Sequence, residues 1–337
     1  MHGDPRLQGR SEDAFARLNL LGEAPLFRET LRLIVRIARV DATVLIQGET
    51  GTGKELAARA LHYLSPRRDY PFVPVNCGAL PDNLLESELF GHERGAFTDA
   101  KQARRGLVAE AQGGALFLDE VETMTPRAQG VLLRFLQDHK YRPVGARAQA
   151  DGDLRIIAST NVDLEELVRR NQFRRDLMFR LSTLSITMPP LRQRGGDAVL
   201  LAEHFLDRYA VGYDRARKRL HPDTVAWLLA HDWPGNVREL ENLMLREFLL
   251  GDGDTIRFRA DGADARAVGD EDVVQPFKVA KARAVARFER SYLDNLLEKT
   301  GGNVSLAARI SRKGRSALNK LAKKHGLSGE QFRPRSG

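Results

Sequence analysis

The chain of 337 residues is 42% hydrophobic and has a mean hydropathy of −0.38, values typical of a water-soluble protein with roughly two or three domains. No apolar run approaches the ~18 residues that a membrane helix needs, and no apolar segment follows Met1. Membrane-spanning and secreted proteins are therefore excluded, and we expect a cytoplasmic location. Cys77 is the only cysteine, which rules out a disulfide within the chain.

The positive charge is concentrated at one end of the chain. Residues 278–337 hold 15 Lys/Arg and 4 Asp/Glu, a net charge of +11, whereas the total is +8 and the rest of the chain carries −3. A basic segment beside a mildly acidic body favours a nucleic-acid-binding module attached to a domain with another task. A solvated basic tail is the alternative, and the charge count does not separate the two.

The N-terminal half predicts an α/β domain after a short polar segment at residues 1–19. Between residues 20 and 189, short apolar runs alternate with helical patterns such as Lys54–Leu64 and Arg127–Asp138. The alternation predicts a mostly parallel sheet flanked by helices. Four runs have the character of buried strands: Thr43–Ile46, Phe72–Val75, Ala115–Leu118 and Arg155–Ala158.

A glycine-rich loop follows the first predicted strand and opens a helix. Its glycines allow backbone N–H groups to approach phosphate, and the helix N-terminus adds a positive end. Lys54 is placed to reach the β- and γ-phosphates, so we expect a nucleotide site. The generic loop has Ser or Thr after this lysine to bind Mg²⁺, and here the residue is Glu55. The candidate nucleotide-binding residues are Gly48, Glu49, Thr50, Gly51, Thr52, Gly53, Lys54 and Glu55.

Two carboxylates end a later apolar strand, Leu116–Glu120. In this interpretation Asp119 holds Mg²⁺ and Glu120 polarises the attacking water. A strand followed by a capped helix is the structural alternative. Phosphoryl transfer also needs cations, and the segment Phe173–Leu181 supplies Arg174 and Arg180. A surface arginine cluster is the competing interpretation of these two residues.

A loop between the two nucleotide motifs, Glu93–Gln102, has an apolar tip at Ala96-Phe97-Thr98 between polar or flexible neighbours. An exposed aromatic side chain on such a loop is typical of an interaction site. We therefore expect this loop to contact the target on which the nucleotide energy acts.

Beyond Pro189-Pro190 the pattern becomes helical. We expect three helices without strands in a lid domain at residues 190–250, namely Asp197–Tyr209, Pro222–His231 and Asn236–Leu249. Residues 251–276 are rich in Gly and Asp and predict a linker.

The basic residues 277–337 predict a helix-turn-helix. Ala280–Lys299 is amphipathic, Asn303 is a candidate N-cap of a second helix, and Arg315–His325 is a basic third helix. A basic helical bundle for protein contacts is the alternative. The candidate base contacts are Arg315, Ser316 and Asn319, the candidate phosphate contacts are Lys320, Lys323 and Lys324, and Arg312 and Lys313 of the preceding turn complete the predicted DNA interface.

In this combination the chain resembles the sigma-54-dependent transcription activators, the bacterial enhancer-binding proteins, which are AAA+ ATPases. Residues 95–100 are similar to that family's Gly-Ala-Phe-Thr-Gly-Ala signature, with Asp99 in place of the second Gly. The family also has Glu at the position of Glu55. The resemblance spans roughly residues 20–250, and the C-terminal helices resemble the family's Fis-type helix-turn-helix.

The resemblance implies roles for further residues. Arg174 and Arg180 match the family's paired trans-acting arginines, and their spacing of six residues, about 1.7 helical turns, predicts different tasks, one on phosphate and one on a neighbouring subunit. The resemblance also implies that Asn76 restrains the catalytic Glu120. From the residues alone, Asn76 could equally cap a turn. Thr160 and Asn161 match the family's first sensor and Arg238 its second sensor. The implied sigma-factor contacts are Gly95, Ala96, Phe97, Thr98, Asp99 and Ala100.

The implied function is an ATP- and Mg²⁺-dependent activator that binds upstream DNA, forms a ring, in this family a hexamer, and remodels the RNA polymerase sigma-54 holoenzyme. One alternative is a sigma-54-independent DNA-binding regulator that uses ATP only for oligomerisation, and another is an ATP-driven remodeller of a different target. The commonest family layout has an N-terminal regulatory domain, which we do not expect here. Control would then come from expression level, a partner protein in trans or the ring equilibrium.

Overall fold

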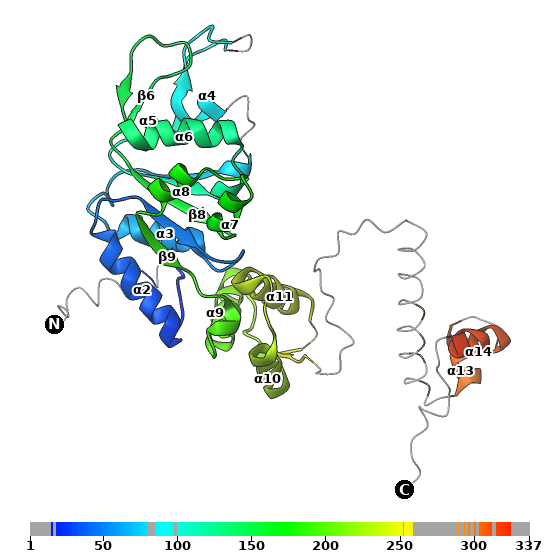
Figure 1. Cartoon of the computed structure of the whole chain (residues 1–337). Helices are drawn as coiled ribbons and strands as arrows, with labels where there is room; N and C mark the ends of the chain where they lie inside the picture. The colour runs from blue at the N-terminus through cyan, green and yellow to red at the C-terminus, as the bar shows by residue number, and fades with distance from the viewer. Residues whose placement is uncertain are drawn as a thin grey trace, which may run out of the picture. The chain divides into compact units, whose positions relative to one another are not determined.

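The computed structural model describes Phe15, residues 18–79, 85–97, 100–251 and 253–258, and in the C-terminal part residues 289, 293, 296, 300, 303–311 and 315–324. The chain divides into two compact units, residues 1–263 and 264–337 (Figure 1). Within the described residues, no helix has both the length and the apolar character to cross a bilayer.

The first unit is built on a five-stranded sheet in the order β2-β5-β8-β1-β9, and every neighbouring pair is parallel. The predicted α/β fold with a parallel sheet is confirmed. The edge strand β9 was not predicted, because its alternating Leu184-Ser-Ile-Thr187 lacks a continuous apolar run. The strands are β1 (Val44–Gln47), β2 (Phe72–Asn76), β5 (Ala115–Asp119), β8 (Arg155–Thr160) and β9 (Leu184–Thr187).

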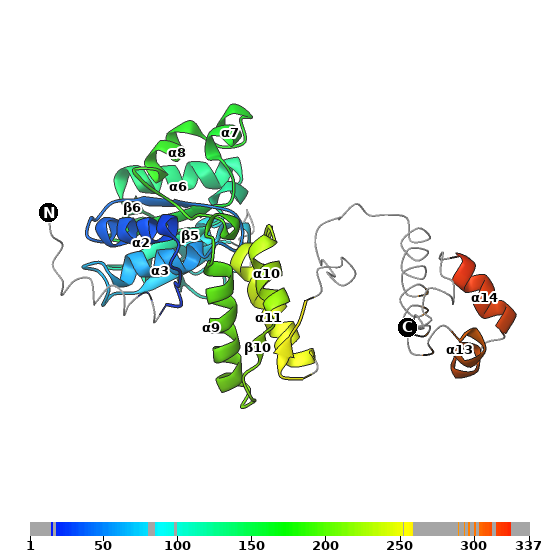
Figure 2. The same ribbon diagram turned by 90° about the horizontal axis from the view of Figure 1, so that it is seen from below.

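Side chains alternate between the two faces of this sheet, so each strand contributes to two cores. On one face Leu116 and Leu118 pack with helices α4 (Leu85–Phe90), α6 (Pro126–Asp138) and α8 (Arg175–Leu181). On the other face Ala115 and Phe117 pack with α2 (Pro25–Ala38) and α3 (Lys54–Tyr63). Figure 2 shows α2 and α3 on one side of β5, with α6, α7 and α8 on the other.

Short elements complete this α/β layer. Two small hairpins, β3/β4 and β6/β7, stand on the α4–α6 side of the sheet (Figure 1). Their bounds are β3 (Gly91–His92), β4 (Arg104–Arg105), β6 (Lys140–Tyr141) and β7 (Ala150–Asp151). The remaining short helices are α5 (Leu107–Glu110), α7 (Leu164–Arg169) and the single 3₁₀ turns η1 (Cys77–Ala79), η2 (Val121–Thr123) and η3 (Leu191–Gln193).

The lid contains the three predicted helices, α9 (Asp197–Gly212), α10 (Pro222–Ala230) and α11 (Asn236–Leu250), packed around the buried Trp233. The expectation of a lid without strands is wrong. Residues Arg219–Leu220 (β10) pair in parallel with Thr255–Ile256 (β11). Ile256 is buried in the lid core, so residues 255–258, which we expected in the linker, pack with the lid because their apolar side chains find a core there.

In the second unit, α13 (Val304–Ile310) and α14 (Arg315–Lys324) pack through Ala307, Ala308 and Leu318. The side chain of Asn303 accepts a hydrogen bond from the backbone of Leu306 at 3.1 Å, which confirms the predicted N-cap. The predicted helix at residues 280–299 lies mostly outside the described residues. Two of its residues that are described, Leu293 and Leu296, are buried in this small core.

Candidate functional site

The polar ends of four strands meet at the carboxyl edge of the parallel sheet. Gly48 follows β1, and Asn76, Asp119 and Thr160 end β2, β5 and β8. Because all strands run in the same direction, these ends share one edge, which is where ligands bind in open α/β sheets. The fold thereby brings together motifs that are far apart in the sequence.

The glycine-rich loop wraps around the side chain of Lys54. Gly53 has φ = 96°, a left-handed conformation that a residue with Cβ rarely adopts, and caps α3. The Lys54 ammonium donates to the carbonyls of Gly48 and Glu49 at 2.7 and 3.0 Å and to the side-chain oxygen of Asn161. Lys54 is buried, and burial lowers its pKa, against the opposing influence of nearby carboxylates led by Asp119. The loop therefore presents a desolvated cation at a helix N-terminus, which is an anion site.

Other side chains of this loop have protein partners. Thr52 donates to the carbonyl of Glu49 at 2.8 Å. The carboxylate of Glu49 pairs with Arg192 of the lid at 2.7 Å. Glu55, which stands at the position of the generic Mg²⁺ ligand, pairs with Arg59 one turn later at 2.8 Å. The side chains of Glu49 and Glu55 are thus engaged away from Lys54.

The two candidate catalytic carboxylates, Asp119 and Glu120, are held by side-chain hydrogen bonds. Ser159 donates to Asp119. Glu120 has φ = 57°, and its two carboxylate oxygens accept from the amides of Asn161 at 3.2 Å and Asn76 at 3.4 Å. The oxygen of Asn76 also accepts backbone N–H groups at 2.9 and 3.2 Å, so this residue contacts Glu120 and caps the turn at once. The turn cap is confirmed, whereas the restraint of Glu120 by Asn76 stays a prediction.

Sequence reasoning missed Glu122, which lies two residues beyond Glu120. One of its oxygens accepts from the backbone N–H of Asn161 at 2.9 Å, and the other is buried without a hydrogen-bond partner among the described residues. Glu122 therefore orients the residue whose side chain joins Lys54 to Glu120. A third acidic residue after a predicted strand was the only signal in the sequence.

The two candidate sensors lie against different residues of the loop, Thr160 against Gly48 and Arg238 against Gly51. The carbonyl of Thr160 accepts from the N–H of Gly48 at 3.3 Å, while its buried hydroxyl donates to the carbonyl of Val162 at 3.1 Å. Asn161, and not Thr160, directs its side chain at the site. Arg238 is exposed in the first turn of α11, and its charge is among the influences that lower the pKa of Lys54.

The two candidate trans-acting arginines flank α8. Arg174 precedes the helix, is exposed and pairs with Asp176 at 2.8 Å. Arg180 lies in the last turn and is exposed, and no ion-pair partner occurs for it among the described residues. The structure therefore presents Arg180 freely and Arg174 in a local ion pair.

The loop between β3 and β4 carries the predicted sigma-factor contacts. Backbone bonds from Gly95 to Ala100 at 2.8 Å and from Ala100 to Phe97 at 3.0 Å close it into a tight turn. Ala96 and Phe97 are half-buried, and the Phe97 ring packs on His92 with centroids 5.0 Å apart, so the expectation of an exposed tip is wrong for these two residues. Contact with His92 of the β3/β4 hairpin reduces the exposed area of the Phe97 side chain. Thr98 and Asp99 lie outside the described residues.

The predicted DNA contacts cluster around α14. Lys320 and Lys324 are exposed, and Lys324 donates to Glu289 at 2.8 Å. Arg315, Ser316, Asn319 and Lys323 lie on α14, and their side chains are outside the described part of the structure. Arg312 and Lys313 lie outside the described residues.

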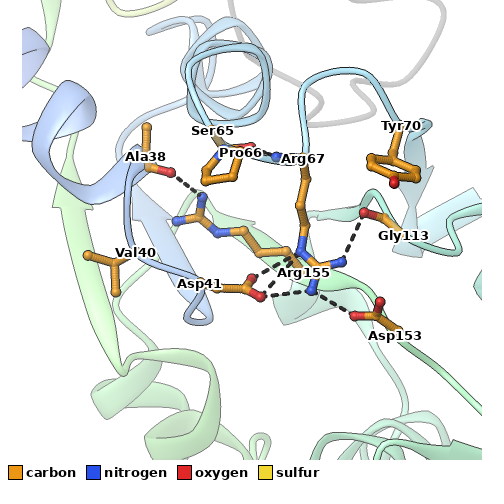
Figure 3. Close-up of a pocket in the computed structure, with 10 residues that line it drawn as sticks. All are labelled: Ala38, Val40, Asp41, Ser65, Pro66, Arg67, Tyr70, Gly113, Asp153 and Arg155. Atoms are coloured by element: carbon orange, nitrogen blue, oxygen red, sulfur yellow. Dashed lines mark hydrogen bonds and ion pairs between the residues drawn. The ribbon is translucent and has the colours of Figure 1, made fainter.

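A cavity of about 380 Å³ lies at the opposite, amino edge of the sheet (Figure 3). Arg67 is held there by Asp41 and Asp153 at 2.7 Å each. The buried Arg155 donates to three carbonyl oxygens at and after the end of α2, those of Ile37, Ala38 and Ala42. Both cations have protein partners, and Arg155 faces the carbonyl oxygens at the C-terminal, negative end of α2.

Comparison with known proteins settles the family. The chain matches the models of the Sigma-54 interaction domain at residues 20–187, the AAA+ ATPase lid domain at 192–262 and the Bacterial regulatory protein, Fis family, at 284–323. It is 43% identical to the transcriptional regulatory protein ZraR of Salmonella typhi over 311 residues, 91% of this chain and 69% of ZraR. The chain belongs to the family of sigma-54-dependent transcription activators.

Further relatives of this activator agree. The transcriptional regulatory protein GlrR of Escherichia coli is 40% identical over 93% of this chain and 69% of GlrR. The crystal structure of NtrX from Brucella abortus in complex with ATP superposes with a TM-score of 0.66 at 34% identity, covering 91% of this chain and 69% of NtrX. The activator is thus an ATPase with the AAA+ fold and a Fis-type DNA-binding domain, and the alternative of a sigma-54-independent regulator is not favoured.

Proposed function

We propose that this activator binds DNA upstream of a promoter, assembles into a hexameric ring and uses ATP hydrolysis to remodel the RNA polymerase sigma-54 holoenzyme to an open complex. The match of residues 20–187 to the Sigma-54 interaction domain carries this proposal. The proposed action on promoter DNA places the protein in the cytoplasm.

In the proposed hydrolysis, Lys54 binds the β- and γ-phosphates and Glu120 orients and polarises the attacking water. Asn161 joins these two groups, since its oxygen accepts from Lys54 and its amide donates to Glu120 at 3.2 Å. Asn76 holds the other oxygen of Glu120 at 3.4 Å. A weak bond of this length is suited to release, so Asn76 restrains Glu120 until the target is engaged.

Asp119 is the proposed protein ligand of Mg²⁺. Its carboxylate ends β5 next to Lys54, and no group of three metal-binding side chains occurs in the part of the chain that the structure describes. This fits Mg²⁺, which is commonly bound through one or two carboxylates, phosphate oxygens and water. When bound, the ion neutralises charge that develops on the phosphates.

Arg174 and Arg180 are proposed to act on the nucleotide site of the neighbouring subunit. Arg180 is exposed and free for this task among the described residues, whereas Arg174 must first exchange its partner Asp176. Two exposed cations, one at each end of one short helix, support contact with the negative charge of a neighbour's nucleotide.

Contact with sigma-54 is assigned to residues 95–100, with Phe97 as the apolar anchor and Thr98 as the polar contact, and Asp99 is tolerated. DNA contact is assigned to α14, with Arg315, Ser316 and Asn319 reading bases. Lys320, Lys323 and Lys324, with Arg312 and Lys313 before the helix, neutralise phosphates.

The test is ATP-dependent open-complex formation on a sigma-54 promoter with purified holoenzyme. We expect Phe97→Ala to reduce open complexes about 30-fold or more, as removal of a central aromatic contact does, while ATP hydrolysis persists. Tyr63→Ala, which truncates an exposed aromatic on α3, is the matched control and should behave as wild type. Wild-type protein that hydrolyses ATP and binds DNA but forms no open complexes would overturn the proposal. A sharp gain in open complexes in Asp99→Gly, from a wild-type level near zero, would show that Asp99 is not tolerated in the contact with sigma-54.

A further inference from the structure

The second residue of the glycine-rich loop is anchored outside the nucleotide site. The two carboxylate oxygens of Glu49 accept from the two terminal nitrogens of Arg192, at 2.7 and 2.5 Å. This is a bidentate pair, which fixes both side chains in one plane. Glu49 belongs to the α/β layer and Arg192 lies in η3 at the start of the lid. Donation by Arg192 lowers the pKa of Glu49 to about 2, so the pair stays charged at neutral pH.

A buried asparagine extends this contact. The side-chain amide of Asn236 donates to Glu49 at 3.1 Å and to the carbonyl of Thr50 at 3.0 Å, and its oxygen accepts from the N–H of Leu191 at 2.8 Å. Asn236 is fully buried with φ = 52°, a conformation that Asn tolerates better than most residues. The amide nitrogen and the oxygen of the Asn236 side chain are thus both used at the junction of the loop and the lid.

The backbones of the loop and the lid also touch directly. The N–H of Val237 donates to the carbonyl of Gly51 at 3.0 Å. A Cβ on Gly51 would lie 2.3 Å from the carbonyl oxygen of Gly235, so only glycine allows this approach. The first turn of α11 is therefore seated on the phosphate loop, and the same turn carries Arg238.

We propose that Glu49 and Arg192 are positioning residues that hold the first turn of α11, and with it Arg238, in register with the phosphate loop. Glu49 thus acts on the lid and not on phosphate or metal. Movement of the lid during the ATP cycle must either break this junction or carry the loop with it. The inference rests on the proposed role of Arg238 as second sensor.

The alternatives predict different patterns of mutational effect. If Glu49 bound phosphate or metal, its loss would be harmful and the loss of Arg192 would not. If the pair were an ordinary surface ion pair, neither loss would matter, because such pairs contribute little. A positioning pair predicts that each loss has the same effect and that the double loss adds nothing further.

The experiment measures kcat, KM and ATP affinity in the full-length chain for Glu49→Gln, Arg192→Gln, the double variant and the charge swap Glu49→Arg with Arg192→Glu. We expect each single variant and the double variant to lose about tenfold in kcat/KM. The swap should recover only part of it, because an arginine at position 49 cannot accept the hydrogen bond that Asn236 donates. Wild-type activity in either single variant, or losses that multiply in the double variant, would overturn the proposal.

Two controls separate this result from other causes. Glu241→Gln breaks the Glu241–Arg208 pair, whose side chains are 41% and 40% exposed, as those of Glu49 and Arg192 are, but which lies wholly within the lid. We expect wild-type activity from it. Arg238→Ala tests the sensor itself. If this variant hydrolyses ATP normally, the proposed sensor role is wrong. If Arg238→Ala loses ATP hydrolysis while Glu49→Gln keeps it, only the positioning role is wrong.

A structural readout checks the same inference without activity. Spin labels at Tyr63→Cys on α3 and Val211→Cys on α9 occupy exposed positions in the two layers, and the native Cys77 is buried. We expect a narrow distance distribution in the parent chain and a broader one in Arg192→Gln. An unchanged narrow distribution in Arg192→Gln would contradict the proposed role.

Discussion

Lys54 lies at the carboxyl edge of the parallel sheet and Arg155 at the amino edge, and burial lowers the pKa of both. Arg155 donates to carbonyls at the C-terminal end of α2, which is the negative end of a helix dipole. Lys54 lies at the N-terminus of α3, beside a glycine-rich loop and ionisable carboxylates. The comparison teaches that a buried cation alone does not identify an anion site. Its position relative to helix ends and free backbone N–H groups does.

The largest expected effect concerns Lys54. Lys54→Met should lower ATP hydrolysis by at least about 100-fold, because the phosphates lose their cation. The thermal midpoint should change little, because the removal of a desolvated charge offsets the loss of hydrogen bonds to the part-buried carbonyls of Gly48 and Glu49. Steady-state ATPase assays and calorimetry measure the two effects, with Lys140→Met at an exposed position as control. A marked fall in the midpoint would show that Lys54 is needed for folding and would break the contrast with Arg155.

The opposite outcome is expected at the other edge. Arg155→Met should lower the free energy of unfolding by about 3 kcal/mol, because buried carbonyls lose their donor. ATP affinity of the folded protein should not change. Thermal unfolding and nucleotide titration check this, and Arg67→Met in the same cavity should cost less, about 1 kcal/mol, since its carboxylate partners are exposed. Lost ATP binding with an intact fold would contradict the structural role of Arg155.

The smallest effect is a pH dependence at the amino edge. His62 is buried, its Nε2 lies 3.0 Å from the carbonyl oxygen of Tyr70, and burial lowers its pKa below the usual 6.5. Just below pH 6.5, His62 binds a proton in the unfolded chain but stays neutral in the folded chain. Stability is therefore complete above this pH and falls below it, with a slope of at most about 1.4 kcal/mol per pH unit.

Denaturant unfolding between pH 5 and 8, compared with His62→Gln, measures this slope. The variant should flatten the curve, whereas the exposed His139→Gln should leave it unchanged. An equal slope in wild type and His62→Gln would mean that other groups cause the pH dependence.

Local patterns predicted much of the α/β layer and of the site. Apolar runs marked four of the five strands, because buried parallel strands such as β1, β5 and β8 are continuously hydrophobic. The expected burial is wrong for β2, an edge strand in which only Val75 is buried. The glycine-rich loop and the pair Asp119 and Glu120 carry their chemistry within a few neighbouring residues. The sequence did not reveal the partner of Glu49, because Arg192 is 143 residues away and only the packing of the lid brings it near.

Other contacts escaped prediction for the same reason. Ile256 joins the lid through a two-residue strand pairing inside a segment rich in Gly and Asp. Phe97 was expected to be exposed because its contact, His92, lies in a hairpin of two-residue strands. Strands of this length are too short to show a periodic pattern in the sequence. Such long-range or very short contacts leave no local signature.

The left-handed backbone of Glu120, with φ = 57°, has a consequence for how this protein could be engineered. A residue with a Cβ in this conformation costs roughly 1–2 kcal/mol relative to its preferred conformations, and glycine avoids most of that cost. Selection for heat resistance alone would therefore drift toward glycine at position 120. Selection for thermal stability favours glycine at position 120, whereas selection for ATP turnover favours the carboxylate of Glu120.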